Sequence, residues 1–378
     1  MIKSFKIRIY PTKVQEELIW KHIGCCRYIW NWMLAKQEEL YAVGEKHLSA
    51  FSMIKLLTPL KNDGEHGWLN EVSASSLQIV CQDLQKAYNC FFKKTSGFPK
   101  FKSRKRSKLS YPVCENRFYF VDNKTVQIQK LGKVRYKTDF SLPLGREYKF
   151  SNPRIMNCND KWMLSFGIKC ESQALELTDI SMGIDLGIKD LAIAECNGQI
   201  VFHNINKSQK MRELRKKQKH LQRSISRKYE ANKQGNCFIK TKNIERLENK
   251  LRKVCYHISN IRKNYIHQCT HALVSLLPSR VVMEDLNIKG MMKNRHLARA
   301  IQEQCLYEFI RQMKYKCEWN GIEFIQANRF YPSSKTCSCC GNIKRDLKLS
   351  DRTYKCDICG LKIDRDYNAA INLSRYIA

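Results

Sequence analysis

The stretch SMGIDLGIKDLAIAE, residues 181–195, decides the fold of this chain. Its apolar residues form a strand-like run that continues through a glycine into LAIA, which is typical of a buried sheet in an α/β protein. Asp185 stands inside this run. An ionised carboxylate there is costly unless it is paired or bound to a metal, although a lone acid in such a strand is more often structural than catalytic. The stretch predicts a buried α/β sheet with a candidate functional acid.

Two further acids occupy comparable positions in the C-terminal half of the chain. Glu284 ends the apolar run of RVVMEDLNIKG, residues 280–290, and Asp366 lies at a helix start in DRDYNAAINL, residues 364–373. Three converging carboxylates would bind divalent cations, and oxygen ligands select Mg²⁺ or Mn²⁺ over zinc. Two such ions can activate a water and stabilise the leaving oxygen of an in-line displacement. The three acids therefore predict a metal-dependent phosphodiesterase.

Neighbouring acids compete for two of these roles. Glu284 and Asp285 would face opposite sides of a strand, so the pleat allows only one of them to reach the site, and Asp285 can cap the following segment instead. Asp364 and Asp366 both lie at a helix start, where an acid can simply cap free N–H groups and favour the helix dipole. The residues alone leave the choice between Asp364 and Asp366 open.

Four cysteines give the strongest local signal. Cys337 and Cys340, then Cys356 and Cys359, form two CxxC knuckles that are separated by fifteen residues, and a glycine closely follows each knuckle. This spacing predicts a structural zinc ribbon, in which four thiolates leave no open coordination position for catalysis. Cys339 lies inside the first knuckle as a bystander. The other cysteines of the 18 are scattered and are expected to be reduced packing residues.

The charge of the chain points to a polyanionic partner. The 378 residues include 68 Lys and Arg against 35 Asp and Glu, a formal charge of +33. Such an excess favours a long polyanion through counterion release, so nucleic acid is the expected partner. The length predicts two or three domains. We expect no membrane segment and a cytoplasmic location, because the sequence contains no run of about 18 apolar residues and its N-terminus lacks the apolar part of a signal peptide.

The most basic region is residues 207–253, with 17 Lys and Arg against 4 Glu, a net charge of 17 − 4 = +13. Apolar residues recur at spacings of three and four in its second half, and NKQGN at 232–236 supplies a turn. This pattern predicts a helical hairpin with basic outer faces. Such faces are often merely solvated, but the imbalance of sign favours a surface that meets a polyanion. The predicted seam contains Ile244, Leu247, Leu251, Val254, Ile258, Ile261 and Tyr265.

The N-terminal half predicts a strand at residues 4–9, then a helix that begins with a Thr12–Gln15 capping box and a second helical run at 76–94. Residues 98–112 carry six basic residues among aromatic ones. They form either a solvated linker or a segment whose Lys and Arg contact phosphates while Phe98, Phe101 and Tyr111 stack on bases. From there to about residue 178, short alternating runs predict a small antiparallel sheet or barrel.

Taken together, these motifs resemble the TnpB (OrfB) proteins of bacterial insertion sequences, and the similarity spans nearly the whole chain. The residues that carry it, besides the two acid-containing segments at 280–290 and 364–373 and the GIDLGIKDLA of the opening stretch, are KIRIYPTKVQ (6–15), GCCRYIWNW (24–32), GFPKFKS (97–103), FYPSSKTCSCCG (330–341) and KCDICG (355–360).

The resemblance implies an α/β multi-domain protein whose nuclease domain is RuvC-like with the RNase H fold. The expected parts are a split wedge-like β-barrel (1–10 and 98–178), a helical recognition lobe (11–97), the RuvC-like domain (179–333 and 361–378) and an inserted zinc ribbon (334–360). The family pattern makes Asp185, Glu284 and Asp366 the catalytic triad and the Mg²⁺ ligands.

By the same resemblance, the activity would be RNA-guided cleavage of DNA, related to that of type V CRISPR effectors. The partners would be a guide RNA derived from the transposon end and double-stranded target DNA with a short adjacent motif, with one protomer per RNA in a nucleoid-associated complex. Neither the three acids nor the four cysteines depart from the pattern, which argues against a nuclease-dead relative. Two alternatives stay open: a catalytically silent RNA-guided or zinc-ribbon DNA-binding regulator, and a strand-transferring transposase.

Overall fold

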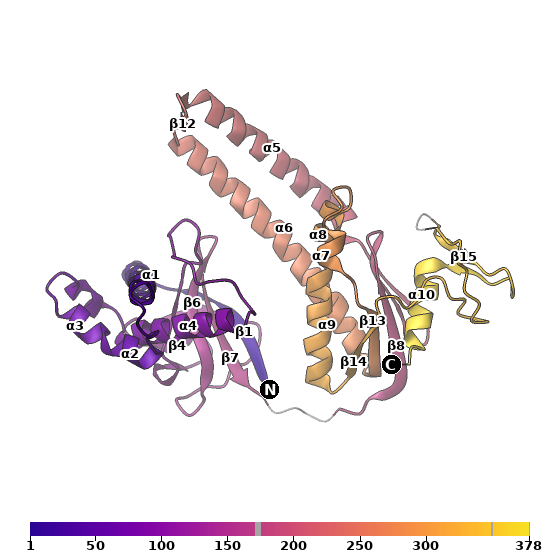
Figure 1. The fold of residues 1–378 in the computed structure, drawn as a ribbon, viewed down its shortest axis with the longest axis horizontal. Helices are drawn as coiled ribbons and strands as arrows, with labels where there is room; N and C mark the ends of the chain where they lie inside the picture. Colours follow the sequence, from indigo (N-terminus) through magenta and orange to yellow (C-terminus); the bar gives the residue numbers. More distant parts are fainter. Residues whose placement is uncertain (171–174, 349–350, 378) are drawn as a thin grey trace. The chain divides into compact units, whose positions relative to one another are not determined.

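The computed structural model describes residues 1–170, 175–348 and 351–377 (Figure 1). The chain divides into two compact units, residues 1–171 and 172–378, and each unit has its own sheet and its own apolar core. The division falls after the last strand of the first sheet and before the strand that contains Asp185. Each unit is described by itself.

The first unit combines a twisted antiparallel sheet with helices. Its elements are β1 (Ile2–Tyr10), α1 (Lys13–Ala42), α2 (Ala50–Lys55), α3 (Leu57–Lys61), η1 (Gly67–Glu71), α4 (Ala74–Phe92), β2 (Ser110–Pro112), η2 (Glu115–Arg117), β3 (Phe118–Phe120), β4 (Thr125–Ile128), β5 (Gly132–Lys137), β6 (Phe150–Cys158) and β7 (Lys161–Lys169).

The seven strands pair in the order β2-β6-β7-β1-β5-β4-β3. The predicted strand at 4–9 lies in β1, and its alternation is confirmed because Ile7 and Ile9 are buried while Lys6 and Arg8 are exposed. Among the described residues, no strand pairing joins β2 to β3, so the sheet is open where a closed barrel was one expectation. Packed aromatic rings, Phe118, Phe120, Phe150 and Phe166 among them, fill its inner face.

The predicted helices at the N-terminus are confirmed as α1 and α4. Thr12 and Gln15 form the expected capping box, in which Thr12 Oγ1 accepts from Gln15 N and Gln15 Oε1 accepts from Thr12 N. The two helices pack through a continuous apolar core. His22 ties them at one end, because its Nε2 accepts from Ser73 N at 3.1 Å.

The basic segment at 98–112 is held against α1. Trp30 Nε1 donates to Lys100 O at 3.0 Å, and Asn31 exchanges two hydrogen bonds with the backbone of Lys102, at 2.9 and 2.7 Å. The segment is therefore anchored at its start and is not a free linker. The prediction that Tyr111 stacks on bases is wrong, because its side chain is buried in the core. Phe98 and Phe101 are exposed.

The second unit contains the sheet that the opening stretch predicted. Its elements are β8 (Thr178–Leu186), β9 (Asp190–Glu195), β10 (Gln199–His203), η3 (Ile205–Lys207), α5 (Gln209–Ala231), β11 (Lys233–Gln234), β12 (Cys237–Phe238), α6 (Lys242–Val274), β13 (Pro278–Glu284), α7 (Ile288–Met291), α8 (Ala298–Gln304), α9 (Leu306–Asn320), β14 (Glu323–Ala327), β15 (Thr353–Lys355), β16 (Lys362–Asp364) and α10 (Arg365–Ser374).

Five strands form this sheet in the order β10-β9-β8-β13-β14. β8, β9 and β10 are antiparallel neighbours, while β8, β13 and β14 run parallel to one another. Apolar residues of β8, β9 and β13 pack with α6 and α9 in one core. The buried α/β sheet predicted around Asp185 is thereby confirmed, with β8 at its centre.

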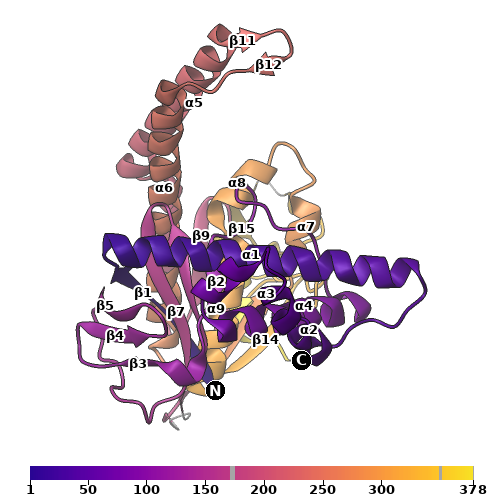
Figure 2. The same ribbon diagram turned by 90° about the vertical axis from the view of Figure 1, so that its left-hand side faces the viewer.

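Helices α5 and α6 form the predicted hairpin, which extends away from the sheet (Figures 1 and 2). The short β11–β12 pair closes the hairpin. β11 lies within the expected turn at 232–236, and β12 follows it directly. The predicted seam is confirmed: Val254 and Ile258 of α6 pack with Met211 and Leu221 of α5. No helix in the described part of the chain is both long and apolar enough to cross a membrane.

Candidate functional site

Asp185 and Glu284 lie at the carboxyl ends of neighbouring parallel strands. β8 and β13 pair up to Ile184 and Met283, so Asp185 and Glu284 occupy the next position of the same register. Residues that are aligned on adjacent strands project to the same side of a sheet. Both side chains are half-buried. The sheet itself thus brings the first two predicted acids together.

Helix α10 adds the third acid by packing on β8 at Gly183. A Cβ atom at Gly183 would collide with the backbone of Ala370 and Ser374, so this approach requires glycine. Asp185 lies two residues beyond Gly183 on the same face of the strand, and Asp366 lies one helical turn before Ala370 on the same face of the helix. The contact therefore directs Asp366 toward Asp185.

The electrostatics of Asp185 identify the other two acids as its neighbours. Burial raises the pKa of Asp185 well above its usual value, and the negative charges of Glu284 and then Asp366 raise it further. The Arg365 guanidinium offsets part of this effect. A carboxylate whose ionised form is disfavoured beside two other acids is expected where a cation binds, because added positive charge offsets the cost of ionisation.

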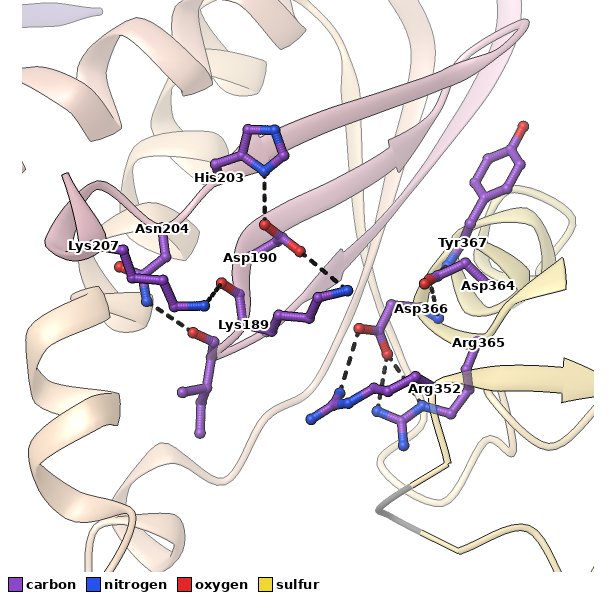
Figure 3. Close-up of polar contacts among 12 residues, drawn as sticks. Lys189, Asp190, His203, Asn204, Lys207, Arg352, Asp364, Arg365, Asp366 and Tyr367 are labelled. Carbon is purple, nitrogen blue, oxygen red and sulfur yellow. Dashed lines mark hydrogen bonds and ion pairs between the residues drawn. The ribbon is translucent and has the colours of Figure 1, made fainter.

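Arginine and serine side chains contact two of the three acids. Asp366 Oδ1 accepts from Arg365 Nη2 at 2.9 Å and from Arg365 Nε at 3.1 Å, and Arg352 Nη1 lies 3.8 Å from Asp366 Oδ2 (Figure 3). Ser333 Oγ donates to Glu284 Oε1. Sequence reasoning missed these three partners, although Arg365 is adjacent to Asp366 and Ser333 lies in the FYPSS segment before the cysteines.

The two competing acids have other partners. Asp364 is the N-cap of α10, and its Oδ1 accepts from Asp366 N at 2.9 Å and from Tyr367 N at 3.1 Å. Asp285 pairs with Arg329, with Asp285 Oδ2 at 2.5 Å from Arg329 Nη2. These contacts occupy Asp364 and Asp285 locally, which favours Asp366 and Glu284 as the members of the central group.

A second polar group lies at the start of β9 (Figure 3). Asp190 Oδ1 is 2.8 Å from His203 Nδ1, and Asp190 Oδ2 is 3.9 Å from Lys189 Nζ. Lys207 Nζ donates to Lys189 O at 3.0 Å. This group joins the first turn of the sheet to β10 and to the segment that leads into the basic hairpin.

The four predicted cysteine ligands converge. Their sulfur atoms all lie within 4.8 Å of one another, and this is the only such cluster of His, Cys, Asp or Glu found in the described parts of the chain. Cys337 and Cys359 sulfurs are 3.6 Å apart, and those of Cys340 and Cys356 are 3.5 Å apart. A tetrahedron with Zn–S bonds of about 2.3 Å would place its sulfurs roughly 3.8 Å apart, so the set fits zinc.

Two buried asparagines connect the cysteine cluster to α10. Asn368 Oδ1 accepts from Ser338 N at 3.0 Å, and its Nδ2 donates to Thr336 O at 2.7 Å. Asn372 Nδ2 donates to Ser333 O at 2.7 Å and to Thr336 O at 2.6 Å. The first cysteine knuckle is thus fixed to the helix that carries Asp366.

Three family models match parts of the chain. They are described as a helix-turn-helix domain of the OrfB_IS605 type for residues 1–46, a probable transposase of the OrfB_IS605 type for residues 165–295, and a Cas12f1-like TNB domain for residues 307–373. In this structure, residues 1–46 form β1 and α1, and the third match covers the segment from α9 to α10 with the four cysteines.

Similar proteins cover the full length. A protein of Streptomyces pristinaespiralis named "Putative RNA-guided DNA endonuclease" is 30% identical over 98% of this chain and 88% of its own. InsQ of Escherichia coli K12, which has the same descriptive name, is 29% identical over 98% of this chain and 91% of its own. A solved structure titled as a Cas12f1–sgRNA–target DNA complex has the same fold, with a TM-score of 0.58 at 14% identity over 99% of this chain and 98% of that chain.

Replacing Gly183 by alanine tests the contact that positions Asp366. The added methyl group must push α10 away from β8, so the free energy of unfolding should fall by about 1–3 kcal/mol. Thermal and urea unfolding measure this change. Gly24→Ala is the matched control, since a Cβ at Gly24 meets no atom within 4 Å. Equal stability of the two variants would contradict the close packing.

The cysteine cluster predicts one zinc ion per chain. Cys356→Ser should lose that zinc and destabilise the cysteine-rich segment, because the metal joins two knuckles that are separated by fifteen residues. Metal content by inductively coupled plasma mass spectrometry checks the result. Cys339→Ser should retain the zinc, since Cys339 is outside the cluster. Retention of zinc by Cys356→Ser would remove that residue from the ligand set.

The raised pKa of Asp185 predicts a pH-dependent cost of stability. The folded protein binds the Asp185 proton more tightly than the unfolded chain, so folding loses stability as the pH rises above the unfolded pKa of about 3.9. In buffer without Mg²⁺ or Mn²⁺, Asp185→Asn should therefore melt at a higher temperature than the wild type. The difference should grow as the pH rises above about 4. A difference that does not vary with pH would show that folding does not raise the pKa of Asp185.

Proposed function

Because the chain belongs to the TnpB (OrfB) family of insertion-sequence proteins, we propose that it is an RNA-guided DNA endonuclease that hydrolyses phosphodiester bonds. The observation that carries this proposal is the convergence of Asp185, Glu284 and Asp366 at the carboxyl end of a parallel strand pair. The names of the relatives and the excess of positive charge on the chain also support the proposed function.

The three acids are the proposed ligands of divalent cations, Mg²⁺ or Mn²⁺. Their fit rests on the donor chemistry, since they offer only carboxylate oxygens and the ionised form of Asp185 is strongly disfavoured without added positive charge. Bound ions of this kind supply an activated water and stabilise the leaving oxygen.

The side chains around the acids have distinct proposed roles. Ser333 orients Glu284 through its hydrogen bond to Oε1. Arg365 and Arg352 contact Asp366 and would present positive charge to a DNA phosphate that binds beside the three acids. Asp364 keeps the first turn of α10 in position by capping it, and takes no part in the chemistry.

The rest of the chain is assigned to binding and support. We assign residues 11–97 to a recognition lobe, residues 1–10 and 98–178 to a wedge-like sheet, residues 179–333 and 361–378 to a RuvC-like nuclease domain of the RNase H fold, and residues 334–360 to a zinc ribbon. The ribbon is structural, because its four thiolates would fill the coordination of zinc. The +33 charge suits a guide RNA from the transposon end and a DNA target with an adjacent motif.

The proposal is tested by reconstituting cleavage with the protein's own RNA. The full chain is purified from cells that carry its transposon end, the co-purifying RNA is sequenced, and DNA that matches the RNA guide is offered with Mg²⁺. Guide-dependent cleavage supports the proposal. Binding without cleavage by the wild-type protein would support a regulator instead, and joined transposon–target products made by the protein alone would support a transposase.

Substitutions at the start of α10 separate the catalytic acid from the cap. Asp366→Asn should lower the cleavage rate by more than about 100-fold, since loss of a ligand costs more than loss of a group that merely orients one. Asp364→Asn should cleave at close to the wild-type rate, because asparagine is also a good N-cap. Single-turnover cleavage at saturating guide RNA measures both rates. The reverse order of effects would assign the third ligand to Asp364.

A further inference from the structure

A pocket of about 460 Å³ lies at the base of the basic hairpin, within the second unit. Helix α5 contributes Arg215 and Lys219, α6 contributes Arg262, and the short α8 contributes Arg299 and Glu303. Figure 1 shows α8 beside the end of the hairpin that is nearest the sheet. The pocket is separate from the three acids and from the four clustered cysteines, none of which lines it.

Positive charge dominates this pocket. Four of the five charged residues named above are cationic, and Glu303 alone carries the opposite charge. Glu303 Oε1 accepts from Arg299 Nε at 2.7 Å and lies 2.8 Å from Arg215 Nη2. One carboxylate therefore serves two guanidinium groups, and a net charge of 4 − 1 = +3 is left around the cavity.

Two arginines in this group are only partly satisfied by the described residues. Arg215 Nη2 is paired with Glu303, whereas Arg215 Nε and Arg262 Nη2 are buried and have no hydrogen-bond partner among those residues. Arg262 Nε donates a hydrogen bond to Asn206 Oδ1 at 2.7 Å. Buried donors are almost always satisfied in folded proteins, so Arg215 Nε and Arg262 Nη2 add uncompensated positive charge beside the pocket.

The crowding of the guanidinium groups agrees with this geometry. Burial lowers the pKa of Arg215, Glu303 raises it, and the positive charges of Arg262 and Arg299 lower it again. The arginines are thus close enough to repel one another, and an anion between them would relieve that repulsion. A phosphate group offers several acceptor oxygens and the charge that planar guanidinium groups bind in a bidentate manner.

We propose that this pocket binds a backbone phosphate of the guide RNA, at the root of the α5–α6 hairpin. The choice of RNA rests on the proposed function, while the phosphate chemistry rests on the arginines alone. Continuity of charge favours a polymer over a free ion, because both helices of the hairpin line the pocket and residues 207–253 carry a net charge of 17 − 4 = +13. A backbone that follows the hairpin would place one phosphate at its base.

The test measures affinity for the co-purifying RNA in the Asp185→Ala background, which removes cleavage from the readout. Arg215→Gln should weaken RNA binding by about 10-fold and reduce the slope of log Kd against log salt by about one. Arg227→Gln is the matched control, since it removes the same charge from an exposed position of α5 outside the pocket. It should weaken binding by less than about 3-fold.

A second variant distinguishes the loss of a phosphate contact from misfolding. Glu303→Gln removes the only competing carboxylate and should tighten RNA binding several-fold, an effect that misfolding cannot produce. Equal weakening by Arg215→Gln and Arg227→Gln, or no gain from Glu303→Gln, would overturn the proposal. The proposal would also be overturned if 10 mM inorganic phosphate raised the melting temperature only when Arg215 is present, while Arg215→Gln left the RNA affinity unchanged. None of these results depends on DNA cleavage, so the proposed nuclease activity is judged separately.

Discussion

The contact between α10 and β8 at Gly183 is the constraint on which the candidate site depends. Two of its acids belong to neighbouring strands and are aligned by the sheet, but Asp366 is 181 residues beyond Asp185 in the chain. It reaches the others only because the helix backbone lies directly against a strand that has no side chain there. The end of α10 is fixed to the same strand, where Ser374 O accepts from Ser181 Oγ at 2.5 Å. Asn368 and Asn372 then bind the cysteine-rich segment to the face of α10 that points away from Gly183.

The electrostatics of the site favour function at the expense of stability. The ionised form of Asp185 is disfavoured by burial and by two neighbouring carboxylates, which is tolerated where a group must bind a cation. The positive charge of Arg365 offsets part of this cost. Charges of the opposite sign cluster at the base of the hairpin, where the proposed phosphate would offset the repulsion among the guanidinium groups.

Much of this arrangement could be predicted from local patterns in the sequence. The apolar runs around Asp185 and Glu284, the capping box at Thr12 and the seam through Val254 and Ile258 predicted elements that the structure confirms, because each depends on neighbours in sequence. Contacts between distant segments could not be read in this way. Neither the burial of Tyr111 nor the open edges of the first sheet follow from local periodicity, since both depend on tertiary packing. The roles of Arg352 and Ser333 likewise appear only once the cysteine-rich segment is placed beside the acids.

The most direct test of the central claim is to locate bound cations in the protein. A crystal of the full chain soaked in Mn²⁺ would reveal the ions by their anomalous scattering, with zinc distinguished by its own absorption edge. The account predicts Mn²⁺ density between Asp185, Glu284 and Asp366, and zinc among the four cysteines. Mn²⁺ bound at Asp364 or Asp285 instead, or no Mn²⁺ near Asp185 at a concentration that supports cleavage, would contradict it.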